Sequence, residues 1–201
     1  MLDPFYLIVD RASWLERLLP SGVRLVQLRI KDQPEAFVRE EVRAAKQLCA
    51  AHGADLVVND YWRIAIEEGC DFIHLGQEDL ADADIGAIRR AGCRLGVSTH
   101  DHRELEIALS VKPDYIALGP VFPTTVKQMD WQPTGTSLVS EWRAALRDTP
   151  LVAIGGITLG ARSSVLQAGA DSAAVVTDVL GHPDPEARAR AWIDATRSFV
   201  R

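Results

Sequence analysis

Short apolar runs alternate with longer amphipathic segments along the whole chain. The runs are rich in Val, Ile, Leu and Ala and lack strict alternation with polar residues, which is typical of strands covered on both faces. We expect strands at Phe5–Val9, Arg24–Leu28, Leu56–Val58, Phe72–Leu75, Leu95–Val97, Tyr115–Leu118, Val152–Ile154 and Ala173–Val176.

The segments between these runs have the periodicity of amphipathic helices. In Glu35–His52, apolar residues recur at spacings of three and four, which places them on one helical face. The same pattern predicts helices at Trp62–Glu68, Asp84–Ala91, His102–Ser110, Leu138–Leu146, Ala161–Ala168 and Pro185–Phe199. Glycine follows three of these helices and is expected to cap their C-terminal ends, at Gly69, Gly92 and Gly169.

A strand followed by a helix, repeated about eight times with a unit of about 25 residues, fits a closed (β/α)8 TIM barrel of parallel strands. An open doubly wound α/β sheet is the alternative. The first strand is followed by "DRASWL" rather than a glycine-rich dinucleotide fingerprint, which favours the compact barrel. Linkers and low-complexity tracts are absent from the sequence, so we expect residues 1–201 to form a single catalytic domain.

Charge and composition argue against several classes of protein. The net charge of -6 is dispersed along the sequence, which argues against nucleic acid as a partner. The N-terminal residues do not resemble a signal peptide, and no apolar run approaches the ~20 residues that cross a bilayer. The three cysteines match no zinc motif and are expected to be buried free thiols. These features predict a cytoplasmic protein.

Polar residues that are unusual for a barrel core cluster where the predicted strands end. In a (β/α)8 barrel these ends form one rim, where active sites lie. The rim residues are Gln27, Arg29, Lys31, Asn59, Asp60, Asp79, Ser98, Thr124, Lys127, Gly155, Gly156, Val176 and Thr177. Each alone has an ordinary explanation as a surface charge, turn or helix cap, and His74 and His100 are interpreted mainly as packing or capping residues.

The combination of charges at this rim indicates a phosphate chemistry. Asp60 and Asp79 lie among Arg29, Lys31 and Lys127, and carboxylates beside an anion site suit a hard cation held between them. Mg²⁺ is commonly held by one or two carboxylates together with substrate phosphate oxygens, which suits a diphosphate. A second, single phosphate is expected near Gly156 and Thr177, after the last two strands. The sequence therefore predicts two small phosphorylated substrates.

The chain resembles the thiamine-phosphate synthase family of proteobacteria. The matching stretches are "VQLRIKD", "NDYWRIAI", "HLGQEDL", "LGVSTHD", "YIALGPVFPT", "VAIGGI" and "AVV", in family order along nearly the whole barrel. The resemblance implies a transferase that joins 4-amino-2-methyl-5-hydroxymethylpyrimidine diphosphate to a thiazole phosphate, or its carboxylated form, and releases pyrophosphate. The implied mechanism is dissociative: a pyrimidine-methyl cation forms, and the thiazole nitrogen attacks it.

The resemblance also assigns roles to individual residues. It implies that the pyrimidine diphosphate is held by Gln27, Arg29, Lys31, Asn59, Ser98 and Lys127, of which Arg29, Lys31, Ser98 and Lys127 are the catalytic candidates. It implies that Mg²⁺ is bound by Asp60 and Asp79. The thiazole phosphate site implied by the family consists of Thr124, Thr125, Val126, Gly156, Val176 and Thr177.

Two features depart from the family pattern. Val126 stands where a threonine is usual, and loss of one neutral hydrogen-bond donor weakens binding by up to about tenfold. Asp178 adds a negative charge beside the expected phosphate site unless it points outward. The stretch "QMDWQPTGTSL", with Trp131, is expected to act as a lid that excludes water.

Two other functions are compatible with the same barrel. One is a sibling enzyme of the thiazole tautomerase type, which handles no diphosphate and has no use for Lys31, Asp60, Asp79 and Lys127 together. The other is a non-catalytic protein that binds thiazole or phosphate. A homodimer is compatible with the family, and no stripe in the sequence establishes one.

Overall fold

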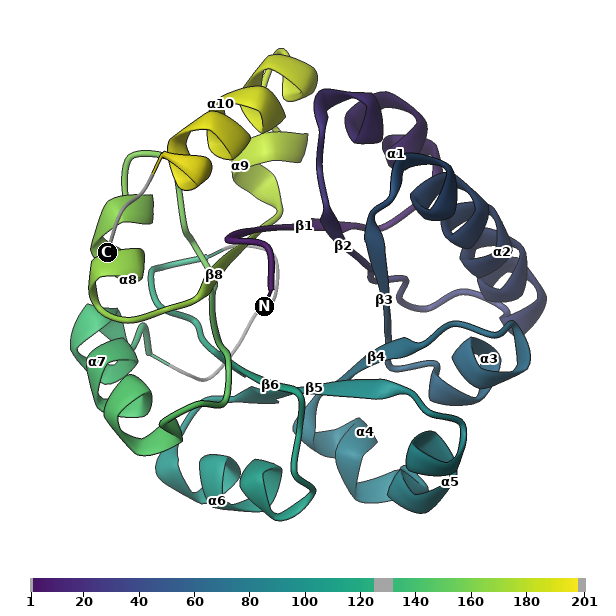
Figure 1. Cartoon of the computed structure of the whole chain (residues 1–201), viewed down its shortest axis with the longest axis horizontal. Helices are drawn as coiled ribbons and strands as arrows, with labels where there is room; N and C mark the ends of the chain where they lie inside the picture. The colour runs from purple at the N-terminus through teal and green to yellow at the C-terminus, as the bar shows by residue number, and fades with distance from the viewer. Residues whose placement is uncertain (1, 125–131, 199–201) are drawn as a thin grey trace.

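The computed structural model describes residues 2–124 and 132–198, and within them the strands form one closed parallel barrel (Figure 1). The strand β1 pairs with both β2 and β8, which closes the sheet. The TIM barrel prediction is therefore confirmed, and the open sheet is excluded. The strands are β1 Phe5–Val9, β2 Leu25–Leu28, β3 Asp55–Asn59, β4 Phe72–Leu75, β5 Arg94–Thr99, β6 Tyr115–Leu118, β7 Leu151–Ile154 and β8 Ser172–Val175.

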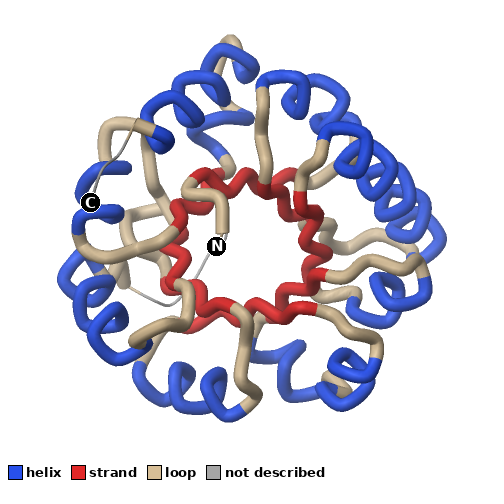
Figure 2. The backbone as a smooth tube through the Cα atoms, viewed as in Figure 1, coloured by secondary structure: helices blue, strands red, loops and turns tan. Residues whose placement is uncertain are grey.

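Helices surround the strands as an outer ring (Figure 2). Those that periodicity predicted are α2 Glu35–His52, α3 Trp62–Glu67, α5 Ile85–Arg90, α6 His102–Ser110, α7 Gly135–Leu146, α8 Arg162–Gln167 and α10 Pro185–Arg197. Periodicity did not predict four short pieces, α1 Ser13–Leu18, η1 Leu19–Ser21, α4 Gln77–Asp82 and α9 Thr177–Leu180. The pieces η1 and α9 have three and four residues, and α4 has a single buried residue, Leu80, so none of these three shows a repeating apolar face.

The glycine caps were predicted correctly. The residues Gly69, Gly92 and Gly169 all have positive φ angles, of 66°, 73° and 112°. This is the left-handed region in which a side chain is unfavourable and in which helices commonly terminate.

Side chains along each strand alternate between two cores, as the strand period of two requires. On β1, Phe5 and Leu7 belong to the large core between strands and helices, whereas Tyr6 and Ile8 belong to a smaller core inside the barrel. Leu2 packs against this inner core, so the segment before β1 covers the N-terminal end of the barrel. The opposite end remains available for a site.

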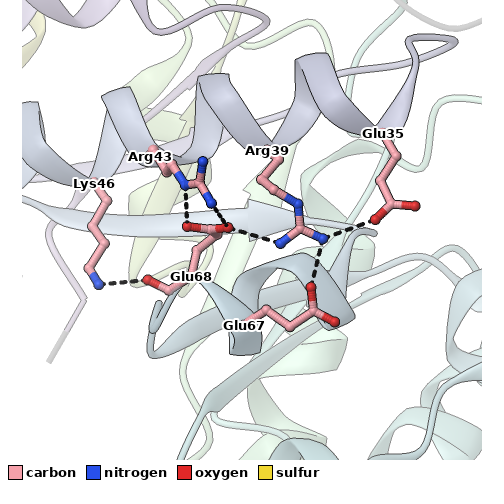
Figure 3. Close-up of polar contacts among 6 residues, drawn as sticks. All are labelled: Glu35, Arg39, Arg43, Lys46, Glu67 and Glu68. Atoms are coloured by element: carbon pink, nitrogen blue, oxygen red, sulfur yellow. Dashed lines mark hydrogen bonds and ion pairs between the residues drawn. The ribbon is translucent and has the colours of Figure 1, made fainter.

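A network of ion pairs joins α2 to α3 on the surface of the barrel (Figure 3). Glu68 accepts hydrogen bonds from Arg43 and Arg39, which hold the pKa of this carboxyl below its usual value. Arg39 also contacts Glu67 and Glu35. These contacts fix the helix pair beside β3, the strand that ends in Asn59.

The cysteines are buried free thiols, as predicted. Burial raises the pKa of Cys49 to about 12 and that of Cys70 to about 11, so both remain protonated near neutral pH and are poor nucleophiles. Among residues 2–124 and 132–198, no helix combines the length and the apolar character that crossing a bilayer requires.

Candidate functional site

A cavity of about 420 Å³ lies where the strands end, at the face of the barrel that carries active sites in this fold. Its volume is in the range that binds small molecules. Eleven of the rim residues predicted from the sequence line it: Arg29, Lys31, Asn59, Asp60, Asp79, Ser98, Thr124, Gly155, Gly156, Val176 and Thr177. Most of the residues that were predicted from their position at strand ends therefore line the same cavity.

One predicted residue does not line this cavity, and three more lie outside the described residues. Gln27 is buried inside the barrel, where its Nε2 donates to the Tyr6 hydroxyl at 2.9 Å, and it is not among the lining residues. Its assignment to the diphosphate remains a prediction. The others, Thr125, Val126 and Lys127, lie outside the described residues, as does Trp131 of the predicted lid.

The cationic side of the cavity is formed by the segment after β2. Arg29 is held in place by its backbone, whose N–H donates to the carbonyl of Val9 at 2.8 Å, and its guanidinium makes no ion pair with a described residue. Lys31 forms an ion pair with Asp60 through Nζ and Oδ2. Two cations from one segment thus face the cavity.

Asp60 follows β3 in an uncommon backbone conformation. Its φ angle is 63°, in the left-handed region that Asp and Asn tolerate better than most residues. Its N–H donates to the carbonyl of His74 at 2.9 Å, which ties this turn to β4. Its side chain is 11% exposed. Backbone strain of this kind is concentrated at functional sites.

Asp79 lies in the first turn of α4, directly after β4. Burial, then the nearby charge of Asp60, then a hydrogen bond between the two side chains, raise the pKa of Asp79. The two carboxyl groups are therefore adjacent, which is the arrangement that a shared cation requires. Within the described residues, no cluster of three or more His, Cys, Asp or Glu side chains could hold a metal ion, so Mg²⁺ here would need further oxygens from substrate and water. The pair fits that kind of site.

Neutral donors face the same cavity. The Nδ2 of Asn59 is buried and has no hydrogen-bond partner among the described residues, although buried donors are nearly always paired. Ser98, on β5, contacts His74 through its Oγ and the ring Nε2 at 2.8 Å. An anionic ligand would supply the acceptor that Asn59 lacks.

The packing interpretation of the two histidines is incomplete. Both line the cavity. His100 is held by Glu104, which accepts from the His100 backbone N–H at 2.7 Å and contacts its Nδ1 at 2.6 Å. His74 is buried, and burial lowers its pKa to about 4, so its ring is neutral near pH 7. The signal for His74 was present in the sequence, because it is two residues from Phe72 and therefore shares its inward face.

The opposite side of the cavity is formed where the loop after β6 crosses the end of β7. Val121 and Phe122 donate backbone hydrogen bonds to Ile154 and Gly155 at 2.9 and 3.0 Å. A Cβ on Gly155 would lie 2.7 Å from Pro120, and one on Gly156 would lie 2.3 Å from the carbonyl oxygen of Pro123. The two glycines are therefore required by the close approach of this loop.

Comparison with known proteins identifies the family of this chain. The profile described as thiamine monophosphate synthase matches residues 5–179. A thiamine-phosphate synthase of Rhizobium etli is 64% identical over 195 residues, covering 97% of this chain and 96% of the relative. This chain belongs to the thiamine monophosphate synthase family. A relative from Cronobacter sakazakii with the same name is 51% identical, covering 97% of this chain and 90% of the relative.

A solved structure supports the assignment to the thiamine monophosphate synthase family. The thiamine phosphate pyrophosphorylase from Pyrococcus furiosus is 26% identical to this chain and superposes with a TM-score of 0.86, covering 97% of this chain and 96% of that one. The barrel and its closure are thus shared by a distant homologue.

The negative charge of Asp178 is neutralised by hydrogen bonds from residues of this same chain. Its carboxylate accepts hydrogen bonds from Arg188 at 3.0 and 2.8 Å, from the indole of Trp192 at 2.7 Å, and from the backbone N–H of Leu159 at 3.1 Å. Burial alone would raise the pKa of Asp178, but the hydrogen bonds from Arg188 and Trp192 outweigh it and lower the pKa. Asp178 therefore anchors α10 rather than repelling a phosphate.

Replacing Asp178 by Asn is expected to reduce the free energy of unfolding by about 1–3 kcal/mol, because the charge-assisted bonds to Arg188 are lost. Since the folded pKa lies below the ordinary Asp value, the stabilisation exists above that value and is lost as pH falls through the folded pKa. Urea unfolding at neutral and acidic pH measures both effects. Asp194→Asn on the exposed side of the same helix is the control, with an expected change within about 0.5 kcal/mol.

Proposed function

We propose that this chain is a thiamine-phosphate synthase that joins 4-amino-2-methyl-5-hydroxymethylpyrimidine diphosphate to a thiazole phosphate or its carboxylated form. The proposal is supported by membership in the family and by one observation in particular: two adjacent carboxylates and two cations share one cavity with an unpartnered amide donor. A site for a simple anion has no use for the carboxylates.

The diphosphate half of the site is assigned to the ends of β2 to β5. Arg29 and Lys31 provide positive charge for phosphate oxygens, and the Asn59 amide and the Ser98 hydroxyl provide hydrogen bonds to them. Asp60 and Asp79 would hold Mg²⁺ together with oxygens of the diphosphate. When bound, Mg²⁺ stabilises negative charge on a departing diphosphate.

The thiazole phosphate half is assigned to Thr124, Gly156, Val176 and Thr177, across the same cavity. Thr125 and Val126, which lie outside the described residues, are assigned to it by resemblance. Gly156 has a φ angle of 65°, so its N–H direction is one that other residues rarely adopt. In this proposal, the two phosphorylated substrates occupy facing sides of one cavity.

The proposed reaction requires little proton transfer by the side chains of this protein. The bond between the pyrimidine methylene carbon and the diphosphate oxygen breaks, and its electron pair leaves with pyrophosphate. The lone pair of the thiazole nitrogen then forms the new C–N bond. The side chains therefore act by charge stabilisation and by holding the two reactants close, while Arg29, Lys31 and Ser98 bind the leaving group.

An assay with both phosphorylated substrates and Mg²⁺ tests the proposal. Mass spectrometry should detect thiamine phosphate, with one pyrophosphate released per product. Chelation with EDTA should abolish product formation, and Mg²⁺ should restore it.

Two results would count against the synthase. Folded protein that yields no thiamine phosphate with either form of the thiazole substrate contradicts it. Calorimetry that shows uptake of the thiazole phosphate alone, without affinity for pyrophosphate and Mg²⁺, would instead identify a binding protein.

A further inference from the structure

A continuous run of hydrogen bonds crosses the interior of the barrel and ends at the cavity. Gln27 Nε2 donates to the Tyr6 hydroxyl at 2.9 Å, and the hydroxyls of Tyr6 and Tyr115 are 3.0 Å apart. The Tyr115 hydroxyl contacts Nδ1 of His74 at 2.6 Å, and His74 Nε2 contacts Ser98 Oγ at 2.8 Å. Four of these side chains are buried, and Ser98 lines the cavity.

The barrel is built to accommodate this run. His74 on β4, Gly96 on β5 and Tyr115 on β6 are neighbours in the strand register. The Tyr115 ring occupies the space beside Gly96, where a Cβ would lie 2.1 Å from the ring. The ring thereby reaches His74 and stacks on it, with centroids 5.5 Å apart. A side chain at position 96 would separate the two residues.

With the Gln27 amide donating to Tyr6, one direction gives every buried hydroxyl proton of the run an acceptor. An amide Nε2 donates and cannot accept, so the Tyr6 oxygen is an acceptor there. Because a buried hydroxyl proton needs an acceptor of its own, the Tyr6 proton points to Tyr115. The Tyr115 proton then points to Nδ1 of His74. A ring that accepts at Nδ1 is neutral and carries its proton on Nε2. His74 therefore donates to Ser98 Oγ, and the Ser98 proton points away from His74.

We propose that His74 is a positioning residue that orients the Ser98 hydroxyl as a hydrogen-bond donor into the cavity. The inference rests on the proposed function, in which Ser98 binds a diphosphate oxygen. With the opposite direction, Ser98 would give its proton to His74 and present only lone pairs to an anion. The direction set at Gln27 thus decides whether Ser98 binds or repels the leaving group.

A pair of amide substitutions separates this role from simple packing. In His74→Gln the side-chain amide lies near the original Nε2 and can still donate to Ser98, whereas in His74→Asn it lies near Nδ1 and falls short. We expect His74→Asn to weaken Mg²⁺-dependent pyrophosphate binding and to lower kcat/KM by about 10- to 100-fold. His74→Gln should recover most of both. Equal effects of the two variants, at equal thermal midpoints, would overturn the role.

A double-mutant cycle tests whether His74 acts through Ser98. In the Ser98→Ala background, adding His74→Asn should change pyrophosphate affinity by less than about twofold, because the group that it orients is already gone. Additive losses overturn the proposal. Tyr115→Phe offers a second variant, since it keeps the ring stacked on His74 but removes the proton donor to Nδ1; it should reproduce part of the His74→Asn effect.

Nitrogen NMR of the unmodified protein, labelled in its histidine rings, reads the tautomer of His74 in the intact run of hydrogen bonds, and a substitution serves only to assign the signals. We expect His74 to carry its proton on Nε2 and to have a bare Nδ1 at about pH 7; the signals are assigned by their loss in His74→Gln. The opposite tautomer in a protein that makes thiamine phosphate overturns the positioning role alone. The expected tautomer in a protein that binds no pyrophosphate overturns the proposed function, and with it the ligand of Ser98.

Discussion

Replacing Asp79 by Asn should lower the rate of thiamine phosphate formation at least about 100-fold while leaving the protein as stable as before or slightly more stable. The loss follows from removal of one of the two carboxylates proposed to hold Mg²⁺. Stability should not fall, because the folded state raises the pKa of Asp79. Ionisation of this group therefore opposes folding as pH rises through the folded pKa, and Asn has no such penalty.

Steady-state kinetics and thermal unfolding of the same preparations check this prediction. Asp82→Asn is the matched control, because it removes one negative charge from the same helix, α4, at an exposed position that does not line the cavity. It should change neither quantity by much. If Asp79→Asn lowered activity and melting temperature in parallel, the metal role of Asp79 would be refuted. Asp60→Asn should also inactivate, and in addition it deprives Lys31 of its partner.

Replacing Gly156 by Ala should both destabilise the barrel and impair the thiazole phosphate site. The φ angle of 65° alone makes a side chain unfavourable by about 1–2 kcal/mol. The new Cβ would also lie 2.3 Å from the Pro123 oxygen and 2.8 Å from the Phe122 oxygen, so the loop after β6 must move, at a further cost of about 1–3 kcal/mol. We expect KM for the thiazole phosphate to rise about tenfold or more, and KM for the pyrimidine diphosphate to change less.

The control variant Gly92→Ala separates the cost of the positive φ angle from the cost of the steric contact with the loop. Gly92 has a φ angle of 73°, and nothing lies within 4 Å of the position of its Cβ. This variant should therefore show the conformational cost of about 1 kcal/mol without any kinetic effect. A Gly156→Ala protein that loses no more stability than Gly92→Ala and keeps its KM for thiazole phosphate would contradict the role assigned to Gly156.

The fold could be predicted because the strands carry a local signal. Each strand is a short apolar run that is covered on both faces, and the longer helices α2, α6, α7 and α10 show a periodic apolar face. The exceptions lack a repeating apolar face: α4 has a single buried residue, Leu80, and α9 has only four residues. Helix α4 matters most, because it places Asp79 beside Asp60.

The position of the site could be predicted because parallel strands bring their carboxyl ends to one rim. What could not be predicted is which side chains contact one another across it. The pairing of Asp178 with Arg188 and Trp192 depends on how α10 packs against α9. The run of hydrogen bonds from Gln27 to Ser98 depends on how five strands are aligned relative to one another along the barrel. Neither relationship is recorded in the local sequence.

The close approach of the Tyr115 ring to Gly96 links residues that are far apart in the chain. A methyl group there would overlap Tyr115, so any homologue that tolerates alanine or a larger residue at position 96 must have a smaller residue at position 115. It would then also lack the phenol that touches His74. Positions 96 and 115 should consequently change together during divergence. A barrel in which both have changed needs a different way to orient the hydroxyl of the serine at position 98.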